Sequence, residues 1–172
     1  MVYYHQDIPS NSVMLGGSYG DDAQNSNSNF SSVGSTTFLS QSNSISNNNN
    51  EDHIFYCFTE IEGYSRFGSY NGNGSTDGAF VYTGFRPAWI MLKRTDSGDD
   101  WIMVDTTRAT INDAGQTLFA NLTDAETDYS TQMDIVSNGF KLRNSGGSKN
   151  ASGGIYVYFA FAETPFKYAN AR

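Results

Sequence analysis

The stretch IYVYFAFAETPF, residues 155–166, is an unbroken apolar and aromatic run that closes on a glutamate and a proline. It is too short for a buried helix, and Gly153 and Gly154 precede it, so we expect a β-strand. Successive side chains of a strand point to opposite faces, and here both sets are apolar. Such a strand belongs in the centre of a sheet that is covered on both sides.

The same pattern occurs once earlier in the chain. Residues 53–60, HIFYCFTE, match residues 156–163, YVYFAFAE, position for position. A shorter match, of residues 2–5 with residues 102–105, keeps the same order along the chain. We interpret these matches as an internal repeat. The strands expected at 54–58 and 157–161 should then be structurally equivalent.

The repeat divides the chain into two unequal copies. The first, residues 1–68, is truncated at its N-terminus, and the second, residues 69–172, is complete. Each copy alone is short for a stable core. We therefore expect the two copies to form one sandwich, with two small sandwiches as the alternative.

Composition favours an all-β protein. Aromatic residues make up 15% of the chain and charged residues only 16%, with many glycines and no sustained 3.6-residue period. Ser137-Asn138-Gly139 lies between two apolar runs and predicts a hairpin. We expect two antiparallel sheets packed face to face. Further strands are expected at residues 1–5, 13–15, 36–40, 79–82, 88–94, 101–105, 117–121, 133–136 and 140–143.

Charge and cysteine content exclude several classes of partner. The net charge of −8 argues against a nucleic-acid partner, which needs clustered Lys and Arg. The longest apolar runs are too short to insert into a membrane. The single cysteine, Cys57, excludes an intrachain disulfide and lies in a segment that we expect to be buried. No cofactor is expected.

Three segments carry a family resemblance: YCFTEIEGYSRFGSYNGNGSTDGAFVYTGFRPAWIMLKRTDSGDDW (56–101), VSNGFKLR (136–143) and NASGGIYVYFAFAETPFKYANAR (150–172). They resemble a tandem repeat in tail-fibre-like or structural virion proteins of marine tailed bacteriophages. The resemblance covers nearly all of residues 55–172. It implies a jelly-roll or concanavalin-like sandwich and a place on the exterior surface of the virion. It supplies no binding or catalytic residues.

Three aromatic residues of a glycine-rich connector are candidate ligand-binding residues. Tyr64, Phe67 and Tyr70 would be exposed there and able to stack on a sugar or a partner protein. Covering the edge of the core is the alternative role.

Two groups of carboxylates are weaker candidates. Asp96, Asp99 and Asp100 surround a turn, where a Ca²⁺ site is the less favoured alternative to a solvated turn. Glu60 and Glu62 share one strand face, as paired carboxylates do in some sandwich-fold glycosidases. A third carboxylate is missing from that pattern, so we expect no catalytic role.

The N-terminal strand is the expected oligomer contact. If the first copy lacks its upstream strands, the strand at residues 1–5 presents an unpaired edge. The contact residues would be Val2, Tyr3, Tyr4 and His5. We expect a homo-oligomer, with a trimer favoured by analogy with phage fibres, or attachment to another virion protein.

The family resemblance implies one function, and the pair Glu60 and Glu62 suggests an alternative. The first is a non-enzymatic virion structural protein, a small capsid or tail appendage or decoration protein, with contact to host-surface glycans left open. The alternative is a glycan-cleaving sandwich enzyme that uses Glu60 and Glu62.

Overall fold

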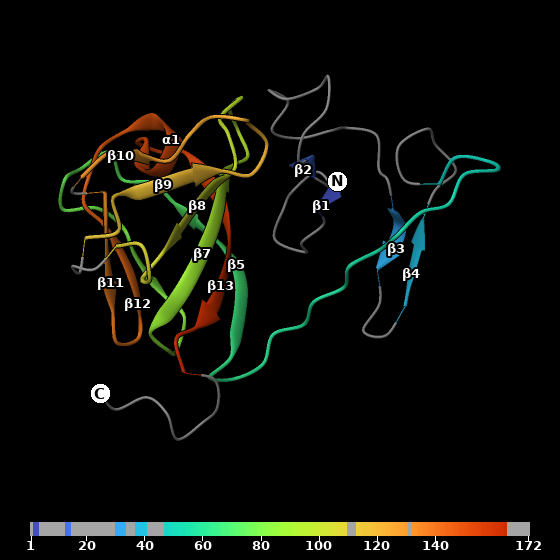
Figure 1. The fold of residues 1–172 in the computed structure, drawn as a ribbon, viewed down its shortest axis with the longest axis horizontal. Coiled ribbons are helices and arrows are strands. Elements are labelled where there is room, and N and C mark those ends of the chain that lie inside the picture. Colours follow the sequence, from blue (N-terminus) through green and yellow to red (C-terminus); the bar gives the residue numbers. More distant parts are fainter. Residues whose placement is uncertain are drawn as a thin grey trace.

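The computed structural model of the chain describes residues 2–3, 13–14, 30–33, 37–40, 47–109, 113–130 and 132–164. It is almost all β, as expected (Figure 1). The elements are β1 (Val2–Tyr3), β2 (Val13–Met14), β3 (Phe30–Val33), β4 (Phe38–Ser40), β5 (Ser65–Asn71), β6 (Phe80–Tyr82), β7 (Pro87–Arg94), β8 (Ile102–Asp105), β9 (Gln116–Phe119), β10 (Thr127–Asp128), β11 (Met133–Val136), β12 (Gly139–Leu142), α1 (Gly147–Asn150) and β13 (Ile155–Ala162).

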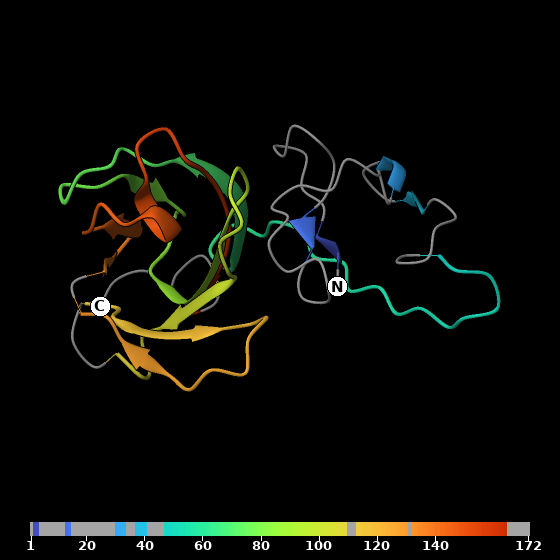
Figure 2. The same ribbon diagram turned by 90° about the horizontal axis from the view of Figure 1, so that it is seen from above.

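Two antiparallel sheets face each other and form a sandwich (Figures 1 and 2). The larger sheet has the strand order β10-β9-β8-β7-β13-β5, and the smaller one has the order β11-β12-β6. The prediction of an antiparallel β-sandwich is therefore confirmed. The only helix among the described residues is α1, and no described segment forms a helix long and apolar enough to cross a membrane.

The C-terminal strand β13 lies inside the larger sheet, between β7 and β5. Its residues Tyr156, Tyr158 and Ala160 point into the core and are at most 3% exposed. Tyr70 of β5 stacks on Tyr156, with ring centroids 4.9 Å apart. The prediction of a central strand at the start of residues 155–166 is confirmed.

The opposite wall of the core comes from the smaller sheet. Ile135 of β11 and Phe140 and Leu142 of β12 are at most 2% exposed. The two strands form the hairpin predicted from Asn138-Gly139, with Val136 opposite Gly139. A Cβ atom on Gly139 would lie 2.0 Å from the carbonyl oxygen of Val81, so the close approach of β6 requires glycine there.

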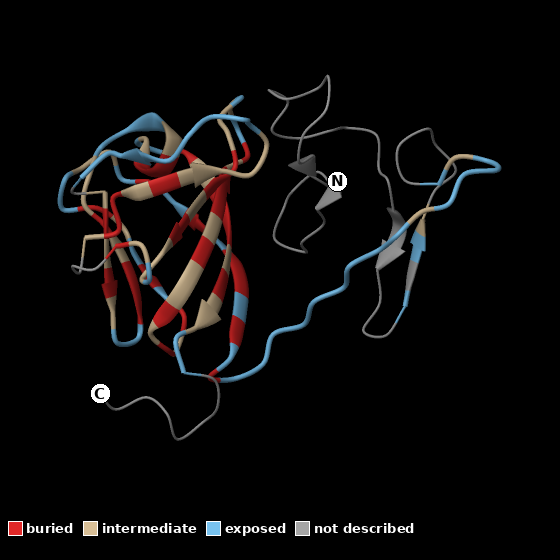
Figure 3. Ribbon diagram, viewed as in Figure 1, coloured by how far each residue is buried: buried red, intermediate tan, exposed pale blue. Residues whose placement is uncertain are grey.

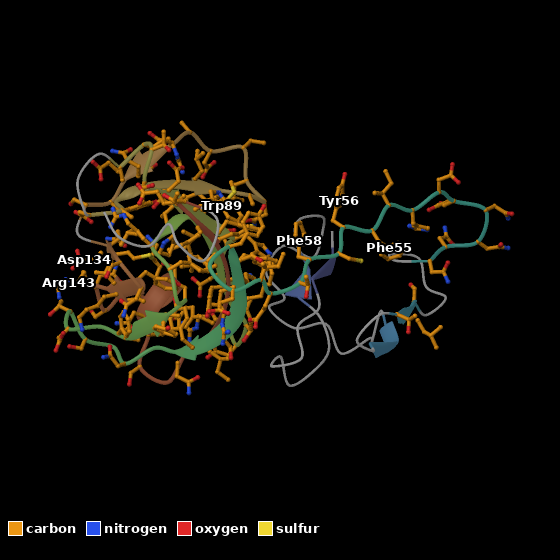
Figure 4. All side chains as sticks on the ribbon, turned by 90° about the horizontal axis from the view of Figure 1, so that it is seen from below. Phe55, Tyr56, Phe58, Trp89, Asp134 and Arg143 are labelled. Atoms are coloured by element: carbon orange, nitrogen blue, oxygen red, sulfur yellow. The ribbon has the colours of Figure 1, made fainter. Side chains whose placement is uncertain are left out.

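The prediction of a buried strand at residues 53–60 is wrong. This segment lies extended outside the sandwich without strand pairing, and Figure 3 shows it mostly exposed. Ile54 is 80% exposed and Tyr56 73%, and Cys57 is exposed as well. The side chains of Phe55, Tyr56 and Phe58 are labelled along it in Figure 4. Residues 54–58 are consequently not the structural equivalent of residues 157–161.

The boundary expected between residues 68 and 69 falls inside β5, a strand that the sequence analysis treated as a connector. That strand pairs with β13 along its whole length, from Asn71 opposite Ile155 to Ser65 opposite Phe161. The division into two repeats otherwise stays a prediction, because much of the first copy lies outside the described residues.

Among the residues before 47 that the structure describes, β1 pairs with β2 and β3 pairs with β4, both antiparallel. One side of the strand expected at residues 1–5 is thus covered by β2. Tyr4, His5 and the side chains of Val2 and Tyr3 lie outside the described residues, so their role in an oligomer contact stays a prediction.

Candidate binding surface

The outer face of the larger sheet, opposite the core, carries a cluster of aromatic side chains. Alternation along β13 places Phe159 and Phe161 on this face, and β5 and β7 add one ring each. The turn before β5 and the end of residues 53–60 add two more. We call this set the aromatic surface: Phe58, Tyr64, Phe67, Trp89, Phe159 and Phe161.

Phe161 is the centre of the aromatic surface. Its ring contacts Phe67 at 5.8 Å and Trp89 at 5.7 Å between ring centroids. Tyr64 lies edge-on to it at 6.0 Å and Phe58 at 6.1 Å. Such tilted and edge-to-face contacts stabilise by about 0.5–1.5 kcal/mol each beyond burial. Phe161 therefore holds rings from three other segments together.

Exposure rises across the surface toward residues 53–60. Phe67 is 7% exposed, Tyr64 39% and Phe58 61%. At the other end of the same face, Trp101 and Val157 are at most 1% exposed and form a second small apolar cluster. One end is thus closed by the protein itself, and the other presents rings to solvent.

The loop that follows β7 closes the covered end. Lys93 is 1% exposed, and its Nζ donates to the carbonyl oxygen of Asp99. Arg94 Nε donates to Asp96 Oδ1 at 2.8 Å and holds the pKa of Asp96 below its usual value. The loop is therefore fixed by its two basic neighbours.

Arg94 and Asn121 contact the three aspartates that were considered as Ca²⁺ ligands at this turn. Asp96 binds Arg94, and Asp100 accepts a 2.8 Å hydrogen bond from Asn121 Nδ2. Asp99 Oδ2 lies 3.7 Å from Arg94. Among the described residues, no group of three or more His, Cys, Asp or Glu side chains is arranged to hold a metal ion. Asp96 and Asp99 both lie beside Arg94, whereas Asp100 is bound by Asn121.

Three ion pairs lie close to the strands that carry the aromatic surface, although Arg66 projects from the face of β5 opposite Phe67. Arg66 lies 3.3 Å from Glu60, and Arg86 lies 2.9 Å from Glu163, measured between nitrogen and carboxylate oxygen. Asp105, which faces Trp89 across the β7–β8 pair, is held by Arg108. Half-exposed rings with polar neighbours can stack on the apolar face of a sugar or pack against a partner protein.

The three predicted ligand-binding residues do not lie on one surface. Tyr64 lies on the exposed part of the aromatic surface, and Phe67 lies beneath it. Tyr70 points the other way: it is 9% exposed and packed in the core, and its hydroxyl donates to the carbonyl oxygen of Lys149 at 2.8 Å. The prediction of an exposed, ligand-stacking Tyr70 is wrong, because strand alternation in β5 separates it from Phe67.

Glu60 and Glu62 lie in different surroundings. Glu60 Oε1 accepts a hydrogen bond from the Phe67 backbone N–H at 3.3 Å, while Oε2 pairs with Arg66. Glu62 is exposed in the turn between the bridge partners Ile61 and Ser65. The strand expected to hold both carboxylates on one face is absent, so this geometry does not favour the glycosidase alternative.

Trp89, Phe159 and Phe161 were not predicted as surface residues. The strand that carries Phe159 and Phe161 was expected to be covered on both sides, although its two apolar faces contained the signal. One face fills the core, and the other needs a cover that the sandwich supplies only over Val157. The surplus of aromatic residues on a strand of this kind marks a second apolar face.

Comparison with known proteins gives one match. No curated protein matches the chain. No solved structure matches it either. A family model described as Domain of unknown function (DUF7483) matches residues 1–165. The chain belongs to this family.

Proposed function

We propose that the protein is a non-enzymatic structural component of the exterior of a bacteriophage virion, and that it attaches through its aromatic surface. The observation that carries this proposal is the half-exposed cluster of rings around Phe161 on the outer face of the larger sheet. The resemblance of residues 56–101, 136–143 and 150–172 to phage structural proteins supports the virion setting.

The chemistry of the surface supports attachment rather than catalysis. Tyr64 and Trp89 offer aromatic area at a low cost in side-chain entropy, and the Asp105–Arg108 ion pair opposite Trp89 supplies a polar neighbour. Another virion protein is the first partner that this surface fits. A host-surface glycan is the second, because sugars stack on exposed rings of this kind.

Particles of a phage that encodes the chain provide the test. Cryo-electron microscopy of the intact particle should locate the sandwich on its exterior. Absence of the chain from purified particles would overturn the proposal.

The role of the aromatic surface is tested with particles that lack the protein. Purified wild-type protein should rebind to them, and Tyr64→Ala with Trp89→Ala should lower its affinity by about tenfold or more, since each ring contact is worth about 0.5–1.5 kcal/mol. Tyr82→Ala is the matched control, because Tyr82 is 62% exposed on β6, away from the aromatic surface. Equal rebinding of all three proteins would exclude the aromatic surface as the attachment site.

A polysaccharide-release assay separates this proposal from the hydrolase alternative. The wild-type protein and the Glu60→Gln, Glu62→Gln double variant should both release nothing from host-surface polysaccharide. Release by the wild type that the double variant loses would replace attachment with catalysis.

A further inference from the structure

We propose that residues 53–60, here named the arm, pair as an added strand with the free edge of β5 in a second copy of this chain. This assembly contact is independent of the proposed place on a virion. It moves the expected oligomer contact from residues 2–5 to the arm and β5.

The first step is the exposure of the arm. Ile54, Tyr56 and Phe58 are 80%, 73% and 61% exposed, on a segment with the residue composition of a strand interior (Figure 4). Contiguous exposed apolar side chains of this kind are characteristic of interaction sites. The arm is thus a strand-forming segment without a sheet.

The second step is the free edge of β5. It is the terminal strand of the larger sheet, and among the described residues no strand pairs with it on the side away from β13. The backbone N–H of Phe67 points to this side, where it meets Glu60. Because backbone direction alternates along a strand, the N–H and C=O groups of Ser69 also face the free edge.

The third step is that the arm starts to pair with β5 of its own chain and then stops. The backbone N–H of Ile61 donates to Ser65 and that of Ser65 donates to Ile61, at 3.1 and 3.0 Å, across a turn in which Gly63 has a φ of 72°. The next rung of this hairpin would join Thr59 to Phe67.

Side chains occupy the donor and the acceptor of one of the two backbone hydrogen bonds that would join Thr59 to Phe67. The Phe67 N–H donates to the Glu60 carboxylate, and the Thr59 carbonyl accepts a hydrogen bond from Ser65 Oγ at 2.9 Å. The pairing with β5 therefore ends at residue 61, and residues 53–60 stay available to pair with another chain.

The fourth step is the match between the arm and the edge. The arm has two apolar faces, whereas an ordinary edge strand has one. A strand added to β5 would lay one face beside Phe67 on the aromatic surface. It would lay the other beside Gly68 and Tyr70, at the margin of the core. Both faces of the arm would then be covered.

The size of the contact suits a second copy. Each buried aromatic side chain removes about 150 Å² or more from water, so Tyr56 and Phe58 on two exchanged arms remove up to about 600 Å². With Ile54 and the surface that the arms cover, this reaches the roughly 1,200 Å² at the lower end of stable interfaces. Because donor and acceptor lie on one chain, exchange closes into a dimer or a small ring.

Sedimentation of purified full-length protein is the first test. The wild type should be an oligomer, and the Tyr56→Ser, Phe58→Ser double variant should be a monomer. The control is Phe80→Ser with Tyr82→Ser, which removes two rings of similar exposure from β6 and should stay oligomeric. A monomeric wild type, an oligomeric arm variant or a monomeric control would each overturn the proposal.

Cys57, the only cysteine of the chain, allows a second test. In the Ser69→Cys variant, an arm docked on β5 brings the two thiols within disulfide reach. Oxidation should give covalent oligomers on a denaturing gel. The same variant with Cys57→Ser should stay monomeric on that gel. An intramolecular disulfide instead would show that the arm closes on its own β5, and absence of any disulfide would show that it does not dock there; both results overturn the proposal.

Discussion

Residues 53–60 and 156–163 share an apolar pattern that ends in a glutamate, yet one lies outside the sandwich and the other runs through its centre. At equivalent positions, Ile54 is 80% exposed and Val157 fully buried. The difference lies in what flanks each segment. β13 is paired on both sides, by β7 and β5, whereas the arm has one bridge at its end. Strand propensity therefore becomes a strand only where partners supply backbone hydrogen bonds.

The largest expected effect comes from introducing an aspartate at one of two positions that match in the sequence repeat, Ile54 and Val157. Val157→Asp should destabilise the sandwich by about 3 kcal/mol or more, because it replaces an apolar side chain beside Trp101 with a buried carboxylate, whose desolvation the neighbouring Lys93 only partly offsets. Ile54→Asp should change the stability by less than about 0.5 kcal/mol, because its side chain is in water. Urea denaturation of dilute protein measures both. A large loss for Ile54→Asp would mean that the arm is part of the folded core.

The central strand and the hairpin could be predicted because their signals are local. Asn138-Gly139 imposes a turn, and residues 155–162 allow little except a buried strand. β5 could not be predicted, because SRFGSYN has no clean alternation. Its Gly68 fits under the ring of Tyr158, where a Cβ atom would lie 3.0–3.2 Å from the ring and hydroxyl, and this neighbour is remote in sequence. The candidate surface was half predicted for the same reason: Tyr64 stands out locally, whereas the partners of Phe161 come from three other segments.

A smaller contrast is expected at the pair Phe58 and Phe161. Phe161 is half-buried and contacts four rings, so Phe161→Ala should cost about 2–3 kcal/mol, somewhat less than a fully buried phenylalanine. Phe58→Ala removes a ring that is 61% exposed and should cost less than about 1 kcal/mol. Thermal unfolding of the two variants gives the comparison. Equal losses would mean that Phe58 is packed as firmly as Phe161.

The residues that precede the two segments in the chain also differ in burial. Residues 47–52, which precede the arm, are mostly exposed, whereas the helix α1, which precedes β13, contains Lys149, which is 2% exposed. Its Nζ donates to Gln132 Oε1 at 3.0 Å and lies 5.3 Å from the ring centre of Tyr129. Burial lowers the pKa of Lys149 to about 8, and Asp113 partly opposes this.

This buried amine predicts a pH dependence of the sandwich. Between about pH 8 and the ordinary lysine pKa of 10.5, the unfolded chain binds the proton that the folded chain has lost, so raising the pH stabilises the fold. We expect a gain of about 2 kcal/mol from about pH 7.5 to about pH 9.5. Lys149→Met should lack this gain. Burial raises the pKa of Tyr70 well above 10, so ionisation of this tyrosine in the unfolded chain would lower the stability near pH 10. The measurements should therefore stop below that pH. An equal rise of stability with pH in Lys149→Met would mean that other groups cause the effect.

The smallest effect is expected where the two segments are alike. Glu60 and Glu163 end them, and each forms an exposed ion pair, with Arg66 and Arg86 respectively. Exposed pairs of this kind contribute about 0–1 kcal/mol, so Glu60→Gln and Glu163→Gln should each lower the stability by less than about 1 kcal/mol. The loss should shrink further at high salt, because salt screens exposed charges. Urea denaturation at low and high salt measures both. A larger, salt-independent loss for Glu60→Ala than for Glu60→Gln, which keeps an acceptor oxygen, would mean that the hydrogen bond to Phe67 N–H, rather than the ion pair, fixes where the arm leaves β5.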